Sequence, residues 1–236
     1  MLQSTPRRSA GGSEGVVAAA AAAPTVDANT IISWLNETEV EIGAQSDYLT
    51  QLDAAIGDGD HGTNMNRGFT AVGRALAEQA EQAPPGRLLI LAGKTLISTV
   101  GGASGPLWGT ALRRAGRALG DAETFDGEEL AGALDAAISG VVELGAATPG
   151  DKTMIDALTP AAQALHGGLD AGEPIGAALA AAVSAAKAGA ESTVPLQARK
   201  GRASYLGERS IGHLDPGAAS SVIILSALQQ VIDREQ

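Results

Sequence analysis

Residues 86–119 read GRLLILAGKTLISTVGGASGPLWGTALRRAGRAL, and this stretch shows how the chain is organised. The segments 86–99 and 104–119 are rich in Leu and Ala, both strong helix formers, and the glycine cluster 101–105 separates them. Helical segments joined by short connections recur along the rest of the chain. Strand signals are poor, because no short β-branched run alternates between turn residues. The sequence therefore predicts an all-α protein.

Helical patterns continue on both sides of this stretch. Asp27 is a suitable N-cap for a first helix that begins near Asn29. Residues 1–26 consist mainly of Ser, Gly, Ala and Pro, which is typical of a disordered leader, so we expect one domain over 27–236. The remaining helices are expected at about 29–42, 45–54, 63–82, 127–147, 152–167, 174–192 and 216–234.

Charge and composition argue against several functional classes. A net charge of −11 repels nucleic-acid phosphates, so we expect no nucleic-acid partner. The absence of cysteine removes disulfides and thiolate metal sites and fits a cytoplasmic protein. No stretch approaches the roughly 18 uninterrupted apolar residues of a membrane span. The Ala run at 17–23 is too weakly hydrophobic for a secretory signal, so we expect no membrane partner.

Glycines gather at four places, namely 57–62, 101–105, 145–150 and 201–217. Each cluster lies between two expected helices or at the end of one. Glycine permits positive φ and allows backbone amides to approach a ligand closely. We therefore expect one site built from loops at one end of a helical bundle.

The segment Asp53-Ala-Ala-Ile-Gly-Asp58-Gly-Asp60 carries three carboxylates at short intervals. In an extended loop Asp58 and Asp60 point the same way, and Asp53 ends the preceding helix. Such a cluster repels itself, and Mg²⁺ relieves the repulsion. Asp-Gly turns alone also account for the spacing. An EF-hand does not fit, because its glycine and glutamate positions hold Thr63 and Phe69.

One segment offers a place for phosphate, and a second resembles a phosphate-binding motif without matching it. The loop 101–105 leads into a helix, so its amides and the helix N-terminus can hold an anion. The alternative is a plain connection with Ser104 as N-cap. Gly93-Lys94-Thr95 looks like the end of a P-loop, but the position that needs the first glycine holds Leu88 and no strand precedes it. We expect Lys94 on a helix surface.

Two later helices begin with an aspartate in the N-cap position, Asp151 and Asp215, and the second is followed by Pro and Gly. Between them the long connection 197–213 concentrates basic residues. A long basic loop in an acidic protein suggests a lid over an anion, and the alternative is a solvated run of charge. Its basic residues are Arg199, Lys200, Arg202 and Arg209.

Together these motifs resemble the nucleotide-binding subunit of bacterial dihydroxyacetone kinase, in the version driven by the phosphoenolpyruvate phosphotransferase system. The resemblance covers about residues 29–232. It is carried, in order, by Asp53-x4-Asp-Gly-Asp-His-Gly62, Gly101-Gly-Ala-Ser-Gly-Pro-Leu107, Pro149-Gly-Asp-Lys-Thr-Met154, Ala198-Arg-Lys-Gly-Arg-Ala-Ser-Tyr-Leu-Gly-Glu-Arg-Ser-Ile-Gly-His213 and Asp215-Pro-Gly217.

The resemblance implies an antiparallel barrel of eight helices, with ADP in a pocket at one end and two magnesium ions between its phosphates and the protein. The metal ligands would be Asp53, Asp58 and Asp60. Arg202 would also stabilise the transferred phosphoryl group. The nucleotide contacts would come from His61, Gly62, Thr63, Asn64, Ala103, Ser104, Gly145, Met154, Arg202, Asp215, Pro216 and Gly217.

The resemblance also implies partners. A phosphohistidine protein would phosphorylate the bound ADP, and a dihydroxyacetone-binding kinase subunit would supply the acceptor. Because the chain has no room for a fused substrate domain, we expect a separate subunit. The alternatives are a nucleotide-binding subunit of an ATP-dependent ketose kinase, and a nucleotide-state sensor that binds a transcription regulator.

Overall fold

The first helix, α1 (Ala28–Ala44), begins directly after Asp27, as the sequence predicts. Asp27 Oδ1 accepts a hydrogen bond from Thr30 N at 3.0 Å, and Thr30 closes the reciprocal half of a capping box. The computed structural model describes residues 25–79 and 83–235. The leader expected over 1–26 lies outside these residues, except for Thr25 and Val26.

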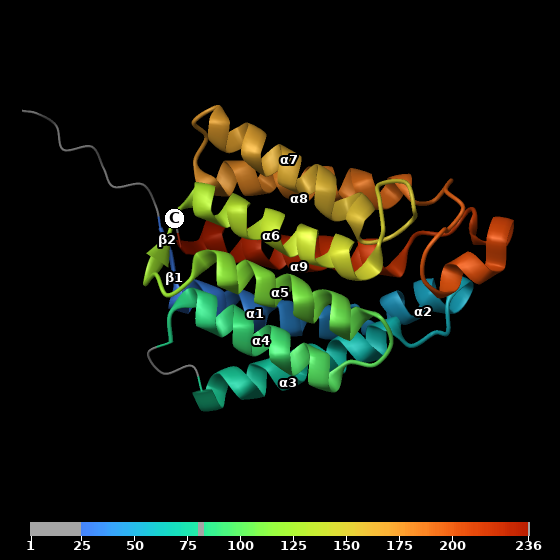
Figure 1. Cartoon of the computed structure of the whole chain (residues 1–236), viewed down its shortest axis with the longest axis horizontal. Coiled ribbons are helices and arrows are strands. Elements are labelled where there is room, and N and C mark those ends of the chain that lie inside the picture. The colour runs from blue at the N-terminus through green and yellow to red at the C-terminus, as the bar shows by residue number, and fades with distance from the viewer. Residues whose placement is uncertain (1–24, 80–82, 236) are drawn as a thin grey trace, which may run out of the picture.

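Helices dominate the described residues, which confirms the all-α prediction (Figure 1). Two very short strands, β1 (Val26–Asp27) and β2 (Thr124–Phe125), pair antiparallel. The helices after α1 are α2 (Ser46–Ile56), α3 (His61–Gln79), α4 (Pro85–Thr99), α5 (Ser104–Leu119), α6 (Gly127–Gly145), α7 (Ile155–Asp170), α8 (Ile175–Ser192), the 3₁₀ helix η1 (Arg202–Ser210) and α9 (Pro216–Glu235).

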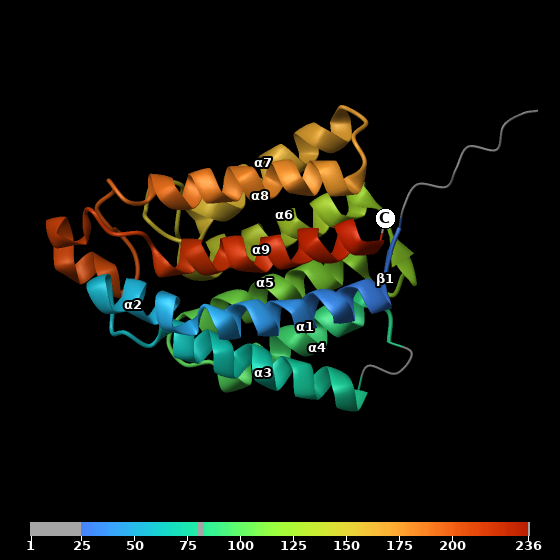
Figure 2. The same ribbon diagram turned by 180° about the vertical axis from the view of Figure 1, so that it is seen from behind.

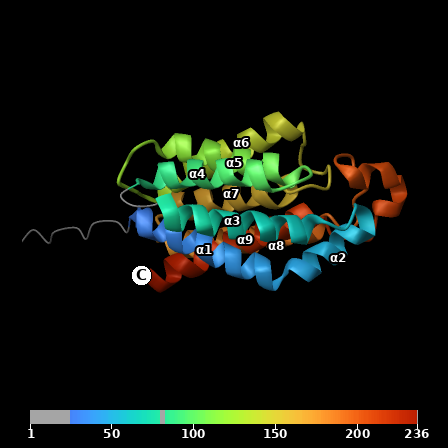
Figure 3. The same cartoon turned by 90° about the horizontal axis from the view of Figure 1, so that it is seen from below.

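The helices lie along one long axis and surround a single main core of Leu, Ile, Val and Ala side chains (Figure 1). Helices α4, α5 and α6 lie side by side in alternating directions, and α1 lies against α9 (Figure 2). Helix α2 and η1 extend from the end of the bundle that is opposite β1 (Figure 3). The two ends of the bundle therefore differ, and we call them the α2 end and the β1 end.

Helices α4 and α5 approach each other closely where two glycines meet. A Cβ on Gly93 would lie 2.5 Å from Gly109 O, and a Cβ on Gly109 would lie 2.6 Å from Gly93 O. Gly93 therefore serves helix packing in the middle of α4, which agrees with the rejection of a P-loop. Lys94 is exposed on the helix surface, as expected.

The start of α7 differs from the expected boundary at residue 152. Gly150 and Lys152 both have positive φ values, 93° and 64°, so the chain cannot be helical there. The prediction that Asp151 caps this helix is wrong: its Oδ2 accepts hydrogen bonds from the backbone N, at 2.9 Å, and the Oγ1 of the preceding Thr148. The carboxylate of Asp156, in the first turn of α7, accepts from Thr153 N at 2.8 Å instead.

None of the described helices is both long enough and apolar enough to cross a bilayer.

Candidate functional site

The four glycine-rich loops meet at the α2 end and surround a pocket of about 760 Å³. Small-molecule sites usually measure roughly 300 to 1,000 Å³. The wall comes from the α2–α3 loop, the loop before α5, the end of α6, the segments before α7 and α9, and η1. The sequence-based expectation of one site built from loops at one end of the bundle is therefore met.

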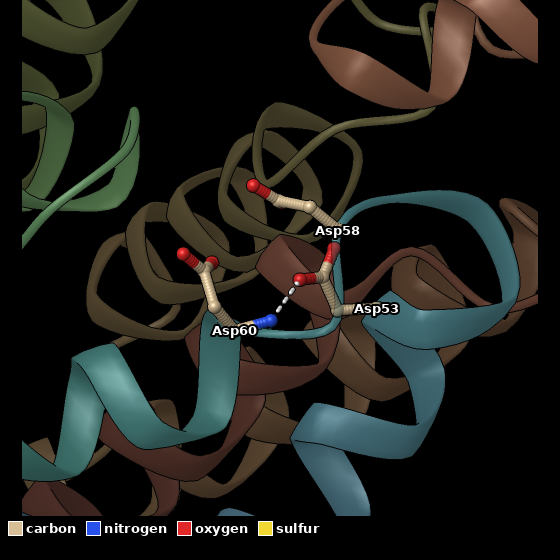
Figure 4. Close-up of side chains that lie close together, drawn as sticks. All are labelled: Asp53, Asp58 and Asp60. Carbon is tan, nitrogen blue, oxygen red and sulfur yellow. Dashed lines mark hydrogen bonds between the residues drawn. The ribbon is translucent and has the colours of Figure 1, made fainter.

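Three aspartates converge on this wall. Carboxylate oxygens of Asp53, Asp58 and Asp60 all lie within 4.8 Å of one another (Figure 4). Asp53 is buried at the end of α2, whereas Asp58 and Asp60 are exposed on the loop that follows. Three like charges this close favour a hard divalent cation, and the donor set of oxygens suits magnesium.

The local sequence explains how Asp53 is held. Its Oδ2 accepts hydrogen bonds from Asp60 N at 2.8 Å and from His61 N at 3.1 Å, so the carboxylate closes the start of α3 (Figure 4). A Cβ on Gly57 would lie 1.9 Å from Asp53 Oδ1. Only glycine at position 57 therefore leaves room for this carboxylate.

Arg202 reaches the same cluster from η1. Its Nε lies 3.0 Å from Asp58 Oδ2, and both side chains are partly exposed. The segment that carries Arg202 therefore lies next to the carboxylate cluster. Arg199 and Lys200 also line the pocket, so it combines negative and positive walls.

His61 links three elements at the base of the pocket. Its Nε2 lies 3.0 Å from Ser220 Oγ on α9, and its Nδ1 lies 3.0 Å from Ser104 Oγ on α5. Because Ser220 Oγ donates to Gly217 O at 3.1 Å, it accepts from His61 Nε2–H, and Ser104 donates to Nδ1. Burial lowers the pKa of His61 despite the opposing charges of Asp53 and Asp60, which fits this neutral form.

Ser104 does not act as the N-cap of α5, which was the structural alternative for this residue. The N-cap position of α5 is Ala103, and no side chain caps this helix. Ser104 uses its hydroxyl on His61 instead. The amides at the start of α5 therefore face the pocket without an intramolecular cap, where they suit an anion.

Asp215 caps the start of α9 from a buried position. Its Oδ2 accepts a hydrogen bond from Ala218 N at 2.7 Å. Burial raises the pKa of Asp215 to about 7, while the bond from Ala218 and the charge of Lys152 oppose the rise. The N-cap expected at this position is confirmed.

Comparison with known proteins identifies the fold family. The DAK2 domain family matches residues 55–230. The ADP-binding subunit of the PEP-dependent dihydroxyacetone kinase of Escherichia coli is 46% identical over 198 residues, which cover 84% of this chain and 94% of that protein. The chain belongs to the DAK2 domain family. The corresponding subunit of kinase 1 of Listeria innocua is 43% identical to this DAK2 domain over 206 residues, 87% of this chain and 98% of that one.

A solved structure shows the same fold. The crystal structure of the dihydroxyacetone kinase from C. freundii in complex with AMP-PNP and Mg²⁺ matches with a TM-score of 0.66 and 27% identity. The match covers 96% of this chain and 38% of that one. The DAK2 domain described here therefore corresponds to about two fifths of that longer kinase.

The pocket of this DAK2 domain includes most of the residues that the sequence singled out. Gly62, Thr63 and Asn64 do not line it. A Cβ on Gly62 would lie 1.9 Å from Ser46 O, so this glycine serves the packing of α3 on α2. Those that line it are Asp53, Asp58, Asp60, His61, Ala103, Ser104, Gly145, Met154, Arg202, Asp215, Pro216 and Gly217.

Sequence reasoning missed two parts of the pocket. One is most of an apolar wall, which comes from α5, α6 and the segment before α7 and of which Met154 alone was expected. The other is Lys152, which lines the pocket although 1% of it is exposed. Nothing in the sequence pattern separates these apolar residues from ordinary core positions. The residues of the apolar wall are Pro106, Leu107, Trp108, Val141, Leu144 and Met154.

Proposed function

We propose that this chain is the ADP-binding subunit of a dihydroxyacetone kinase whose phosphoryl donor is a phosphohistidine protein of the phosphoenolpyruvate phosphotransferase system. The observation that carries the proposal is the convergence of Asp53, Asp58 and Asp60 on the wall of a nucleotide-sized pocket. The E. coli and L. innocua relatives support it, because both are ADP-binding subunits of such kinases and align over nearly their whole length.

The three carboxylates would hold magnesium, and two ions is the number that the resemblance implies. Their oxygens fit a hard cation, and of their neighbours only Arg202 on Asp58 supplies a cationic partner among the described ion pairs. Magnesium bound there would neutralise charge on the phosphates of ADP or ATP. The cluster explains how an acidic protein can hold an acidic ligand.

Residues around the carboxylate cluster would position the nucleotide relative to the bound magnesium. The uncapped start of α5 offers amides from Ala103 and Ser104 to a phosphate. Arg202 would leave Asp58 and turn to the transferred phosphoryl group, where a planar guanidinium binds phosphate oxygens well. The apolar wall, which includes Leu107 and Met154, would receive the base.

The remaining expected contacts differ in kind. Gly145, Pro216 and Gly217 would contact the nucleotide through their main chain, since they line the pocket and have no side chain that could react or bind phosphate. Gly62, Thr63 and Asn64 belong to the first turn of α3 and do not line the pocket, and Gly62 serves the packing of α3 on α2. His61 would orient Ser104 through its Nδ1 and would not need to carry a phosphoryl group.

In the proposed relay the phosphoryl group leaves the histidine nitrogen of the donor for a β-phosphate oxygen of ADP. It then passes from the ATP so formed to a hydroxyl of dihydroxyacetone on the partner subunit, and that hydroxyl loses its proton. ADP is regenerated, so the nucleotide acts as a held cofactor. The chain would work in the cytoplasm, and a transcription regulator that reads the nucleotide state is the further partner that the resemblance implies.

An assay with purified subunits tests the proposal. With the substrate-binding subunit, the phosphohistidine donor and bound Mg-ADP, we expect sustained formation of dihydroxyacetone phosphate. Without the donor, millimolar ATP should give a burst of at most about one product per chain, because release of a metal-bridged nucleotide is slow. Absence of product in the complete mixture, together with no ADP or Mg²⁺ in native mass spectra, would contradict the proposal.

A second candidate is a subunit of an ATP-dependent ketose kinase. It is favoured by one observation, the C. freundii kinase crystallised with AMP-PNP, in which the matching region is part of a longer chain. Sustained turnover with ATP and without the phosphohistidine donor would select this alternative. The site residues keep the same roles in both cases.

A further inference from the structure

Lys152 is an unusual residue for a pocket wall. Within the described ranges 25–79 and 83–235 it is the one buried lysine or arginine, with 1% of its surface exposed. Its φ of 64° lies in the left-handed region, which residues other than glycine rarely adopt. A buried charge in a disfavoured backbone conformation needs partners that hold it there.

The partners of Lys152 are main-chain carbonyls at two distant points of the chain. Its Nζ donates to Thr193 O at 2.6 Å and also to His213 O. Thr193 follows the last residue of α8, and His213 precedes the N-cap of α9 by two residues. The two carbonyls therefore mark the points where the residues between them, the 194–212 loop, leave and re-enter the bundle.

Further hydrogen bonds close the same base. Gly212 N donates to Val194 O at 2.8 Å, and Asp215 N donates to Thr193 Oγ1 at 3.0 Å. The two ends of the 194–212 loop are thus held close together at its base. Lys152 lies at this base and donates to a carbonyl on each of the two segments that form it, Thr193 O and His213 O.

Away from its base the loop makes few contacts with the bundle, one of which is a hydrogen bond from Arg199 N to Asp151 O at 3.1 Å. Ala198 and Ala203 pack with Ile56 in a small apolar cluster separate from the main core. Arg202 pairs with Asp58 at 3.0 Å, but both side chains are exposed to solvent, and such pairs contribute little. A segment with so few buried contacts depends strongly on its base for its position.

We propose that Lys152 is a positioning residue for the 194–212 loop. Its ammonium holds the two ends of the loop together and thereby fixes where Arg202 stands over Asp58 and where Asp215 begins α9. Buried carbonyls lose bonds to water, and a charged donor compensates better than a neutral one. The ammonium is used on main-chain oxygens, so we assign it no contact with the reacting atoms.

Hydrogen exchange measured by mass spectrometry tests the loop directly, without nucleotide. The variant is Lys152→Met, which keeps the length of the side chain and removes its donors. We expect amides of the 194–212 loop to exchange about tenfold faster or more, while α4 and α5 are unchanged. Lys187→Met, an exposed lysine on α8, is the charge-matched control and should behave as the natural protein does.

A second control separates positioning from general loss of stability. Leu89→Ala in α4 creates a cavity in the main core far from the loop. If it speeds exchange of the 194–212 loop as much as Lys152→Met does at equal melting temperature, the positioning role is overturned. Unchanged exchange of the loop in Lys152→Met overturns it as well.

The effect on nucleotide binding rests on the proposed function, whereas the effect on the loop does not. Release of a fluorescent ADP analogue in the presence of Mg²⁺ should be about tenfold faster in Lys152→Met. If the natural protein binds no ADP but the loop still loosens in the variant, the proposed function fails and the positioning role stands. If ADP binds, and the loop loosens while release is unchanged, the loop does not control the nucleotide and that part is overturned.

Lys152→Gln supports the comparison if Lys152→Met does not fold. Its amide is neutral and therefore a weaker donor than the ammonium. The exchange rate of the loop amides should thus fall between the rates in the natural protein and in Lys152→Met. Failure of both variants to fold would make Lys152 a determinant of the whole fold, and the specific role at the loop would be overturned.

Discussion

The start of α1 at the β1 end and the start of α5 at the α2 end are built in two different ways. At the β1 end, α1 and α6 begin with capping boxes formed by Asp27 and Asp126, and α4 and α8 begin after prolines. At the α2 end, Asp53 accepts hydrogen bonds at the start of α3 and Asp215 caps α9, whereas α5 begins after Ala103 with no side-chain cap. The start of α1 is therefore closed by the protein itself, and the start of α5 is left open beside the pocket.

This difference separates residues that stabilise the fold from residues that serve a ligand. At a capped helix start the free backbone amides already have hydrogen-bond partners, so a bound anion adds little stabilisation there. An uncapped start beside glycines keeps its amides available, and it favours negative charge through the helix dipole. Loss of the cap at the start of α1 should therefore affect stability alone, whereas substitutions around the pocket at the α2 end should affect binding.

The largest expected effect comes from the carboxylates at the α2 end. Asp58→Asn or Asp60→Asn should weaken magnesium-dependent ADP binding on the order of 100-fold or more, because each removes a charged metal ligand. The melting temperature should not fall, since like charges are being removed. Titration calorimetry with Mg-ADP measures the affinity, and Asp126→Asn at the β1 end should leave it unchanged. Equal ADP affinity in all three variants would remove the distinction between the ends.

The next effect concerns pH and the buried cap Asp215. Its pKa is raised from 3.8 to about 7, so the folded protein binds a proton more tightly than the unfolded chain does. The resulting contribution to stability is complete below about pH 4 and is lost as the pH rises to about 7. Relative to Asp215→Asn, the natural protein should lose on the order of a few kcal/mol over this range. Urea unfolding at pH 5 and pH 8 measures it, and parallel curves for the two proteins would count against a buried, proton-binding Asp215.

A smaller effect is expected at the hydrogen-bond chain between the elements of the α2 end. Ser220→Ala leaves His61 Nε2–H without its partner in a buried position, which should cost about 1–3 kcal/mol of stability. ADP binding should weaken too, because His61 orients Ser104. Chemical denaturation and calorimetry measure both quantities, with the exposed Ser184→Ala on α8 as control. A stable variant with normal ADP affinity would show that His61 needs only Ser104.

The smallest effect is expected at the β1 end, where Asp27→Ala removes a capping box. The loss should be about 1 kcal/mol, with ADP affinity unchanged. Its pKa is lowered, mainly by the hydrogen bond from Thr30 N, which is the reverse of the shift at Asp215. The contribution of Asp27 is therefore present above about pH 4 and lost at more acid pH. Denaturation at pH 7 and at pH 3 measures this, and an equal loss at both pH values would disagree with the lowered pKa.

The sequence predicted the helices and the cluster of carboxylates on the α2–α3 loop, because both depend on local signals. Asp27 marks the start of α1 because its side chain caps that helix, and Asp58 and Asp60 lie close together across Gly59, whose φ of 73° lets the chain bend there. The start of α7 was placed three residues early, since the left-handed backbone of Lys152 depends on contacts that only the folded chain provides.

The contacts between distant segments could not be predicted in the same way. Ser104 looks like a helix cap in sequence, yet it bonds His61, which is 43 positions away. Gly62 belongs to a motif associated with nucleotide, but its close approach to Ser46 O explains the glycine by packing alone. Such assignments depend on which elements the topology brings together.

Both ends of the described chain lie at the β1 end (Figure 1). Thr30 Oγ1 near the first described residues donates to Glu235 Oε2 near the last at 2.7 Å, and Arg234 pairs with Glu37 at 2.8 Å. A polypeptide joined at either terminus would thus emerge away from the pocket and leave its mouth open to other molecules. This placement is compatible with two settings of the same domain, because the match covers 94% of the E. coli subunit but 38% of the longer C. freundii chain.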